Sequence, residues 1–302
     1  MSSDPLFTGS IPALVTPFRN GAVDKPAFAA LVERQIAGGS AALVPVGTTG
    51  ETSTLSTEEH KAVVSLCVEV AAGRVPVIAG AGSNATEEAI DLVAHAKAVG
   101  ADAALVVCPY YNKPNQAGLY AHFKAINDAV ALPVFVYNVP GRTIVDLMPP
   151  TVAALAALPN IIGIKDASDE MERVALHSHL IGQNKGEHQQ FIQLSGEDSS
   201  ALAHRAMGGA GCISVTANVL PEACAAMHAA FDDGDLETAR AINQRIVLLH
   251  RAMFASPSPG PAKYALSRMG LCTDEVRLPI TPPDAAAREQ IDAALRLAGV
   301  SL

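Results

Sequence analysis

A lysine at the end of an apolar run is the residue best placed for chemistry. Lys165 closes the stretch Ile161-Ile162-Gly163-Ile164-Lys165, whose composition is typical of a strand covered on both faces. Because side chains alternate along a strand, Gly163 and Lys165 share one side, and we expect Gly163 to leave room beside the lysine stem. Desolvation in an apolar slot favours the neutral amine, which can attack a carbonyl carbon. The alternative is a lysine that reaches into solvent.

Elements of two kinds alternate around this stretch. Short apolar runs predict strands at 10–15, 41–46, 75–79, 103–108, 134–138, 161–165, 191–195 and 212–215. Amphipathic, alanine-rich stretches predict helices, including those at 25–37, 57–72, 86–99 and 118–131. Three of these helices have a candidate N-cap, at Asp24, at Ser56 and at Asn84 or Ala85. Eight βα units in succession predict the α/β class and a (β/α)8 TIM barrel.

The pattern becomes purely helical after the eighth strand. Helices are predicted at 221–231, 236–254, 261–269 and 284–298, with no low-complexity linker before them. We therefore expect residues 1–230 to form the barrel that carries the active site. Residues 231–302 are expected to form a C-terminal helical region packed on the barrel.

Composition excludes several classes of partner. The 302 residues are 49% hydrophobic and 17% charged, and the net charge of −9 argues against nucleic acid and anionic membranes. No apolar run reaches the roughly 18 residues of a membrane span. The start, Met1-Ser2-Ser3-Asp4-Pro5, shows no signal peptide, and the five cysteines are scattered as expected for reduced thiols. These features predict a cytoplasmic protein.

Nothing in the motifs calls for a cofactor or a metal. The dispersed histidines, His188 among them, avoid the strand ends, so we expect surface or interface positions for them and no metal. Gly80-Ala81-Gly82-Ser83-Asn84-Ala85 matches a dinucleotide fingerprint, but the next strand ends in Cys108-Pro109 without an acid. Glycines in a tight turn explain that match better. Glu197 and Asp198 are interpreted as capping acids.

Polar side chains gather at the predicted carboxyl ends of the strands, where barrel enzymes place their chemistry. Hydroxyls, phenols and one lysine fit a Schiff-base site that shuttles protons. The candidates are Thr48, Thr49, Tyr110, Tyr111, Tyr137, Arg142, Lys165 and Gly196. Each also has a simpler explanation: Tyr137 as an aromatic strand residue, Thr48 and Thr49 as helix caps, Tyr111 as a core or interface aromatic, and Arg142 as an exposed turn residue.

Taken together, these segments resemble the dihydrodipicolinate synthase / N-acetylneuraminate lyase family of pyruvate-using (β/α)8 enzymes. The resemblance extends from Phe7 to Pro282. It depends most on Gly47-Thr48-Thr49-Gly50-Glu51, Pro109-Tyr110-Tyr111-Asn112-Lys113-Pro114, Tyr137-Asn138-Val139-Pro140-Gly141-Arg142-Thr143, Gly163-Ile164-Lys165-Asp166-Ala167 and Ile213-Ser214-Val215-Thr216-Ala217-Asn218.

The resemblance implies a reaction and a role for each site residue. Lys165 would form a Schiff base with pyruvate, and the resulting enamine would attack aspartate semialdehyde, a step of lysine and diaminopimelate biosynthesis. Tyr137 would donate and accept protons, and Thr48 would link it to Tyr111 of a neighbouring subunit. Thr49, the backbone at Ile213 and nearby Gly196 would face the bound pyruvate. Arg142 would bind the carboxylate of the second substrate, which suits its fork geometry.

The resemblance also implies an assembly and a regulatory site. Family members are usually homotetramers built as dimers of dimers, and we expect the same here. Residues matching the site at which lysine inhibits many members are Ser53, Thr57, His60, Asn84, Glu88 and Tyr110. Thr57 departs from the histidine of some lysine-sensitive members, so inhibition and its absence both stay open.

Two other functions fit the same residues. A related pyruvate-dependent class I aldolase or dehydratase would use the same lysine on a sugar acid or hydroxy-keto acid. A catalytically idle member would only bind a keto acid or an amino acid.

Overall fold

A computed structural model describes residues 7–184 and 191–302, so the start Met1–Pro5 and His188 lie outside the described residues. The chain divides into two compact units. The first unit comprises Met1–Thr8 and Ile78–Cys212, and the second comprises Gly9–Val77 and Ile213–Leu302.

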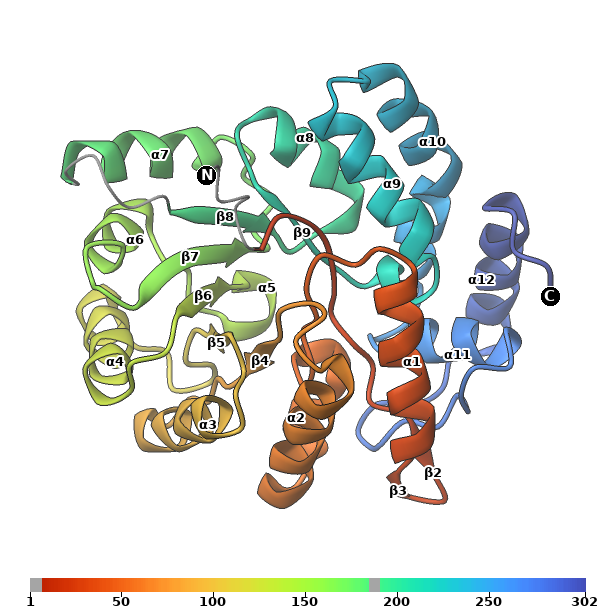
Figure 1. Cartoon of the computed structure of the whole chain (residues 1–302), viewed down its shortest axis with the longest axis horizontal. Helices are drawn as coiled ribbons and strands as arrows, with labels where there is room; N and C mark the ends of the chain where they lie inside the picture. Colours follow the sequence, from red (N-terminus) through yellow and green to blue (C-terminus); the bar gives the residue numbers. More distant parts are fainter. Residues whose placement is uncertain (1–6, 185–190) are drawn as a thin grey trace. The chain divides into compact units, whose positions relative to one another are not determined.

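Parallel strands form the centre of the first unit. They are β4 (Ile78–Gly80), β5 (Ala103–Val107), β6 (Val134–Asn138), β7 (Ile161–Asp166), β8 (Ile192–Ser195) and the first half of β9 (Gly211–Ser214). Each pairs in parallel with the next along the chain. The helices are α3 (Thr86–Ala98), α4 (Gln116–Ala129), α5 (Pro140–Thr143), α6 (Pro149–Leu155), α7 (Arg173–Asn184) and α8 (Ala201–Ala206). In Figure 1, α3, α4, α6 and α7 lie along the outer side of these strands.

The second unit joins an early and a late part of the chain, Gly9–Val77 and Ile213–Leu302. The amide of Ala13, just after β1 (Gly9–Pro12), donates to the carbonyl of Ser214 at the end of β9 over 2.8 Å. Its helices are α1 (Lys25–Ala37), α2 (Thr57–Ala71), α9 (Pro221–Asp232), α10 (Leu236–Ala252), α11 (Gly260–Arg268) and α12 (Ala285–Leu297). The C-terminal helices share one apolar core with residues from the start of the chain, including Val15 and Leu31.

Hydrogen bonds join the strands of the main sheet in the order β1-β9-β8-β7-β6-β5-β4, which confirms seven of the eight predicted strands. The prediction at 41–46 was wrong, because this segment makes isolated bridges, Ala13 to Val44 and Leu43 to Val77. Pro45 has no N–H to donate to a ladder, and Val46 turns the backbone with a φ of 48°.

A small hairpin was missed. Strands β2 (Phe18–Arg19) and β3 (Ala22–Val23) pair antiparallel around Asn20-Gly21. Both turn residues have positive φ, 55° and 83°, as a tight hairpin turn requires. The Asn-Gly dipeptide was a signal for this turn in the sequence.

The predicted helix starts were largely confirmed. The Asp24 side chain accepts the amide of Ala27, and Ser56 and Glu59 form a reciprocal capping box. At α3 the cap position is Ala85, which has no side chain able to cap, and the hydroxyl of Ser83 accepts the Ala85 amide instead.

The surface or interface positions expected for the histidines were wrong for most of those described. Six of them are buried within the chain: His60, His122, His177, His204, His228 and His250. A neutral imidazole can be buried when one ring nitrogen finds a partner, as His250 does with Thr216 and His177 with Gln193. Burial lowers the pKa of His122 and of His204 to about 4, which keeps both rings neutral.

Within 7–184 and 191–302, no helix is both long and apolar enough to cross a membrane.

Candidate active site

Lys165 and Tyr137 face the same side of the sheet in the first unit. They are register partners on β7 and β6, so their side chains leave neighbouring strands in the same direction. Lys165 Nζ lies 4.2 Å from the centroid of the Tyr137 ring, and each residue is only 7% exposed. The lysine therefore does not reach into solvent. Its amine and the phenol ring are close neighbours near the carboxyl ends of two parallel strands.

Two glycines shape the surroundings of this pair, but in different ways. A Cβ at Gly163 would lie 2.6 Å from the Phe135 ring and 2.3 Å from the carbonyl oxygen of Ile192. The space at Gly163 thus admits Phe135, and the expectation that it serves the lysine stem was wrong. Gly196 fills that role instead, because a Cβ there would lie 3.1 Å from Lys165 Cε.

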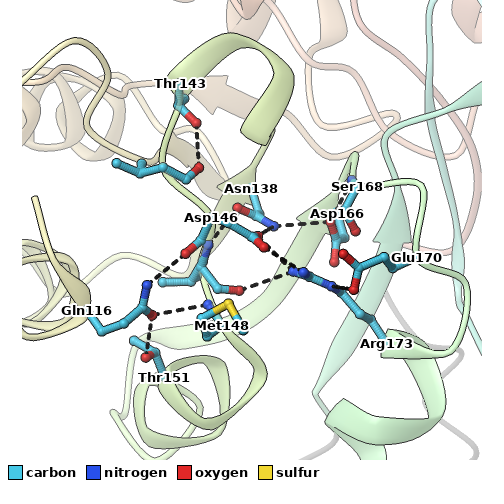
Figure 2. A network of polar contacts seen from close by, with 12 residues as sticks. Gln116, Asn138, Thr143, Asp146, Met148, Thr151, Asp166, Ser168, Glu170 and Arg173 are labelled. Atoms are coloured by element: carbon cyan, nitrogen blue, oxygen red, sulfur yellow. Dashed lines mark hydrogen bonds and ion pairs between the residues drawn. The ribbon is translucent and has the colours of Figure 1, made fainter. Parts of the chain in front are cut away.

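The two strands of the pair end in a polar network (Figure 2). Asn138 follows Tyr137 and is fully buried. Asp166 follows Lys165 and is the register partner of Asn138. The Asn138 side-chain amide donates to Asp166 Oδ1 over 3.3 Å. The sequence drew attention to neither residue in this role, since only the register of β6 and β7 brings them together.

Asp146 and Arg173 form the charged part of this network and were also missed. The guanidinium donates to both carboxylate oxygens, over 2.8 and 2.6 Å, and the Arg173 side chain is 4% exposed. Hydrogen bonding by Arg173 holds the pKa of Asp146 below its usual value, and the same bonds raise the pKa of Arg173. Both groups therefore stay charged at neutral pH.

Two predicted site residues of the first unit are exposed. Arg142 lies on the short helix α5, directly after β6, with its side chain exposed. Tyr111 follows β5, has a φ of 72° and is 90% exposed. A positive φ is uncommon for a residue other than glycine, so the backbone at Tyr111 is unusual.

The remaining predicted site residues belong to the second unit. Thr48 and Thr49 begin a 3-10 turn (Thr48–Gly50), with Thr48 half-buried and Thr49 5% exposed. The helix cap that follows is Ser56, so capping is not the role of the two threonines. The hydroxyl of Thr16 donates to the carbonyl of Gly50 over 2.7 Å and fixes the end of the turn. Ile213 is buried on β9.

A buried ion pair, missed in the sequence, closes this loop of the second unit. Glu51 follows the turn with a φ of 57°, and its carboxylate accepts a hydrogen bond from Lys263 of α11. The two side chains are 3% and 0% exposed. Burial lowers the pKa of Lys263, and the neighbouring Glu51 carboxylate opposes that shift.

The residues that match the site for the inhibitor lysine belong to both units. In the second unit, Ser53 is exposed in a short 3-10 turn, Thr57 opens α2, and His60 is buried one turn later. In the first unit, the Asn84 amide donates to the Tyr110 carbonyl over 3.1 Å. The exposed Glu88 accepts the hydroxyl of Ser83.

Other loop motifs serve the packing. A Cβ at Gly82 would lie 2.5 Å from the Val107 amide nitrogen, so this glycine allows close contact with β5. Glu197 accepts the Ser199 amide over 3.1 Å and caps the turn after β8, as predicted. In the part of the chain that the structure describes, no three His, Cys, Asp or Glu side chains are grouped to hold a metal.

The fold places a buried lysine beside a tyrosine on neighbouring parallel strands of an α/β protein. Comparison with known proteins gives the family. The chain belongs to the dihydrodipicolinate synthetase family, whose sequence model matches residues 6–298.

Relatives and solved structures agree over nearly the whole length. The chain is 77% identical to a 4-hydroxy-tetrahydrodipicolinate synthase of Hyphomonas neptunium, over 98% of this chain and 100% of that protein. The dihydrodipicolinate synthase of Acinetobacter baumannii complexed with pyruvate is 47% identical, with a TM-score of 0.92 over 97% and 99% of the two chains. The enzyme of Cyanidioschyzon merolae with lysine bound is 37% identical, with a TM-score of 0.92 over 98% and 99%.

Proposed function

We propose that this protein has 4-hydroxy-tetrahydrodipicolinate synthase activity and condenses pyruvate with L-aspartate 4-semialdehyde through a Schiff base at Lys165. The observation that carries the proposal is the buried Lys165 amine, 4.2 Å from the centre of the Tyr137 ring. A relative of that name with 77% identity and a solved neighbour that holds pyruvate support it.

The chemistry follows from a nucleophilic amine beside a phenol. Lys165 Nζ attacks the ketone carbon of pyruvate, and loss of water gives an iminium, which withdraws electrons from the methyl group. A methyl proton leaves, and the enamine carbon attacks the aldehyde of the second substrate. The amine of that substrate then displaces Lys165 and closes the ring. Tyr137 donates and accepts the protons in these steps.

The other site residues take part by binding. We assign Thr49, the backbone of Ile213 and the neighbourhood of Gly196 to the pyruvate, and Thr48 to a proton relay with Tyr137. In this proposal residues 1–230 close into a (β/α)8 barrel with the site at its mouth, and residues 231–302 pack on it. The parallel pairing from β4 to β9 supports the barrel.

Arg142 is proposed to bind the carboxylate of aspartate semialdehyde. Its guanidinium presents parallel donors that match a carboxylate. Its exposed position directly after the strand of Tyr137 leaves it open to a ligand. A related aldolase or dehydratase would use a sugar acid or hydroxy-keto acid in place of this carboxylate.

The decisive experiment traps the Schiff base. Incubation with pyruvate and borohydride is expected to add a stable mass to Lys165, and Lys165→Ala is expected to show neither the adduct nor turnover. The buried Lys263 serves as an internal control, because it is held by Glu51 and should stay unmodified. Absence of an adduct would refute the Schiff-base mechanism. Faster retro-aldol cleavage of hydroxy-keto acids than condensation would instead favour the aldolase.

Tyr111 is proposed to act from a neighbouring subunit of a cytoplasmic homotetramer built as a dimer of dimers. The 90% exposure of its side chain supports this role. Mixing the inactive Lys165→Ala and Tyr111→Phe variants should then restore activity, because one site of each hybrid dimer has an intact lysine and an intact tyrosine. Mixing Lys165→Ala with Tyr137→Phe is the matched control, since Tyr137 belongs to the same subunit as its lysine. Equal results from the two mixtures would contradict the assignment.

The residues Ser53, Thr57, His60, Asn84, Glu88 and Tyr110 are proposed to bind free lysine at the subunit interface. The lysine-bound neighbour supports this, and the exposed Glu88 carboxylate suits an ammonium group. Adding lysine to the condensation assay should lower the rate for wild type and not for Glu88→Gln. Insensitivity of the wild-type enzyme would remove this site.

A further inference from the structure

The strand of Tyr137 and the loop that follows it are fastened to each other by one buried side chain. Asn138 Oδ1 accepts the amide of Leu147 over 2.9 Å, and Asn138 Nδ2 donates to Asp146 Oδ1 over 2.9 Å. The segment between Asn138 and Asp146 is therefore a closed loop with both ends held at β6 (Figure 2). Arg142 lies in the middle of this loop, on α5.

The interior of the loop is also fixed. The hydroxyl of Thr143 contacts two backbone carbonyl oxygens of the loop, those of Val139 at 3.1 Å and Val145 at 2.9 Å. Ile144 takes a left-handed conformation with a φ of 63°, which ends α5. The contacts of Thr143 thus fix the backbone that carries Arg142, while the Arg142 side chain is exposed.

Charge anchors the loop to the next βα unit. Arg173, at the start of α7, donates two hydrogen bonds to Asp146, and its own side chain is 4% exposed. Such forked, charge-assisted pairs are stronger than neutral hydrogen bonds and fix the relative orientation of the two side chains. A second acidic partner, Glu170, accepts a hydrogen bond from Arg173 over 2.9 Å, but its side chain is 56% exposed, so this ion pair adds little stability.

We propose that Asp146, held by Arg173, is a positioning residue that sets the place of Arg142 for the carboxylate of the acceptor aldehyde. The inference rests on the proposed function, because it takes Arg142 as the residue that binds this substrate. Lys165 depends much less on Asp146, since the parallel ladder of β6, β7 and β8 holds it. Loss of Asp146 should therefore raise the KM for aspartate semialdehyde more than the KM for pyruvate.

The test is steady-state kinetics of Asp146→Asn with each substrate varied in turn. The KM for aspartate semialdehyde should rise by about 10-fold to 100-fold, the loss typical of a displaced binding group. The KM for pyruvate and the rate of borohydride trapping should stay within about twofold. Glu170→Gln is the matched control, because it removes the exposed partner of the same arginine and should change both KM values by less than about twofold.

A double-mutant cycle separates positioning from general destabilisation. If Asp146 acts through Arg142, Asp146→Asn should change little in an Arg142→Ala background. Additive effects, or equal increases in the two KM values, would overturn the proposal. Should Asp146→Asn fail to fold, Arg173→Lys keeps the cation and loses the fork, and it should show the same inequality between substrates.

The proposed function fails differently. Wild type that does not consume aspartate semialdehyde would refute that function, and an unchanged KM in Arg142→Ala would remove both the role of Arg142 and this inference. Borohydride trapping at Lys165 remains measurable in every variant, so the Schiff base is tested independently.

Discussion

The buried ion pair of Lys263 and Glu51 is predicted to stabilise the loop that contains Thr48 and Thr49. Lys263 Nζ donates to the Glu51 carboxylate and, over 2.9 Å, to the carbonyl of Glu275. It also lies 3.9 Å from the centroid of the Phe18 ring. Each contact belongs to the second unit, and the lysine side chain is 0% exposed.

Replacing Lys263 with methionine keeps an unbranched side chain, one heavy atom shorter, and removes its charge. Glu51, whose side chain is 3% exposed, then stays buried without its cation. Breaking a buried pair from one side typically costs about 3–5 kcal/mol, because desolvation of the remaining charge is no longer offset. Glu51 keeps one donor, the Arg277 amide at 2.9 Å, so we expect the lower end of that range, about 3 kcal/mol.

Thermal unfolding followed by circular dichroism measures this loss. For a chain of 302 residues, about 3 kcal/mol corresponds to a fall in Tm of roughly 5 °C. The control is Lys124→Met, which breaks an ion pair whose partners are 48% and 52% exposed. An exposed pair of this kind contributes under about 0.5 kcal/mol, so its Tm should change by about 1 °C at most.

A second variant separates the lone charge from other losses. Combining Glu51→Gln with Lys263→Met removes both charges, and this double variant should melt above Lys263→Met alone. The reasoning is refuted if Lys263→Met and Lys124→Met have the same Tm. It is also refuted if the loss of stability in the double variant equals the sum of the losses in Glu51→Gln and Lys263→Met.

Three further predictions concern the proposed roles of Tyr137 and Lys165 and the half-buried ion pair of Glu59 and Arg277. Tyr137→Phe should lose roughly 10²–10⁴-fold in turnover while still forming the trapped adduct, and a near-normal rate would contradict its role in proton transfer. Gly196→Ala should slow borohydride trapping, because the new Cβ would lie 2.6 Å from Ala167 Cβ and 3.1 Å from Lys165 Cε, and an unchanged trapping rate would argue against close packing there. Hydrogen bonding by Arg277 lowers the pKa of Glu59 from 4.5 to about 2, so the pair stabilises the fold above pH 4.5 and this contribution is lost as the pH falls towards 2. The free energies of unfolding of wild type and Glu59→Gln, measured with urea, should therefore converge as the pH falls from 4.5 towards 2. A difference between them that does not change with pH would contradict the titration of Glu59.

Local patterns were sufficient for most of the elements. The helix at Lys25–Ala37 and the strand at Val134–Asn138 agree with their predicted ranges, because periodicity and end signals depend on residues only a few positions apart. The same local reasoning failed at 41–46, where Pro45 interrupts an otherwise apolar run, and at Asn20-Gly21, whose turn signal was overlooked.

Local sequence patterns were enough to place Lys165 and Tyr137 near the carboxyl ends of two successive strands. They could not determine which glycine stands beside the lysine, because Phe135 and Gly196 approach from strands far along the chain. The pair of Glu51 and Lys263 joins residues 212 positions apart, and no local pattern marks it. These contacts depend on the folded chain, since the register between strands and the packing of helices determine which distant side chains share a buried space.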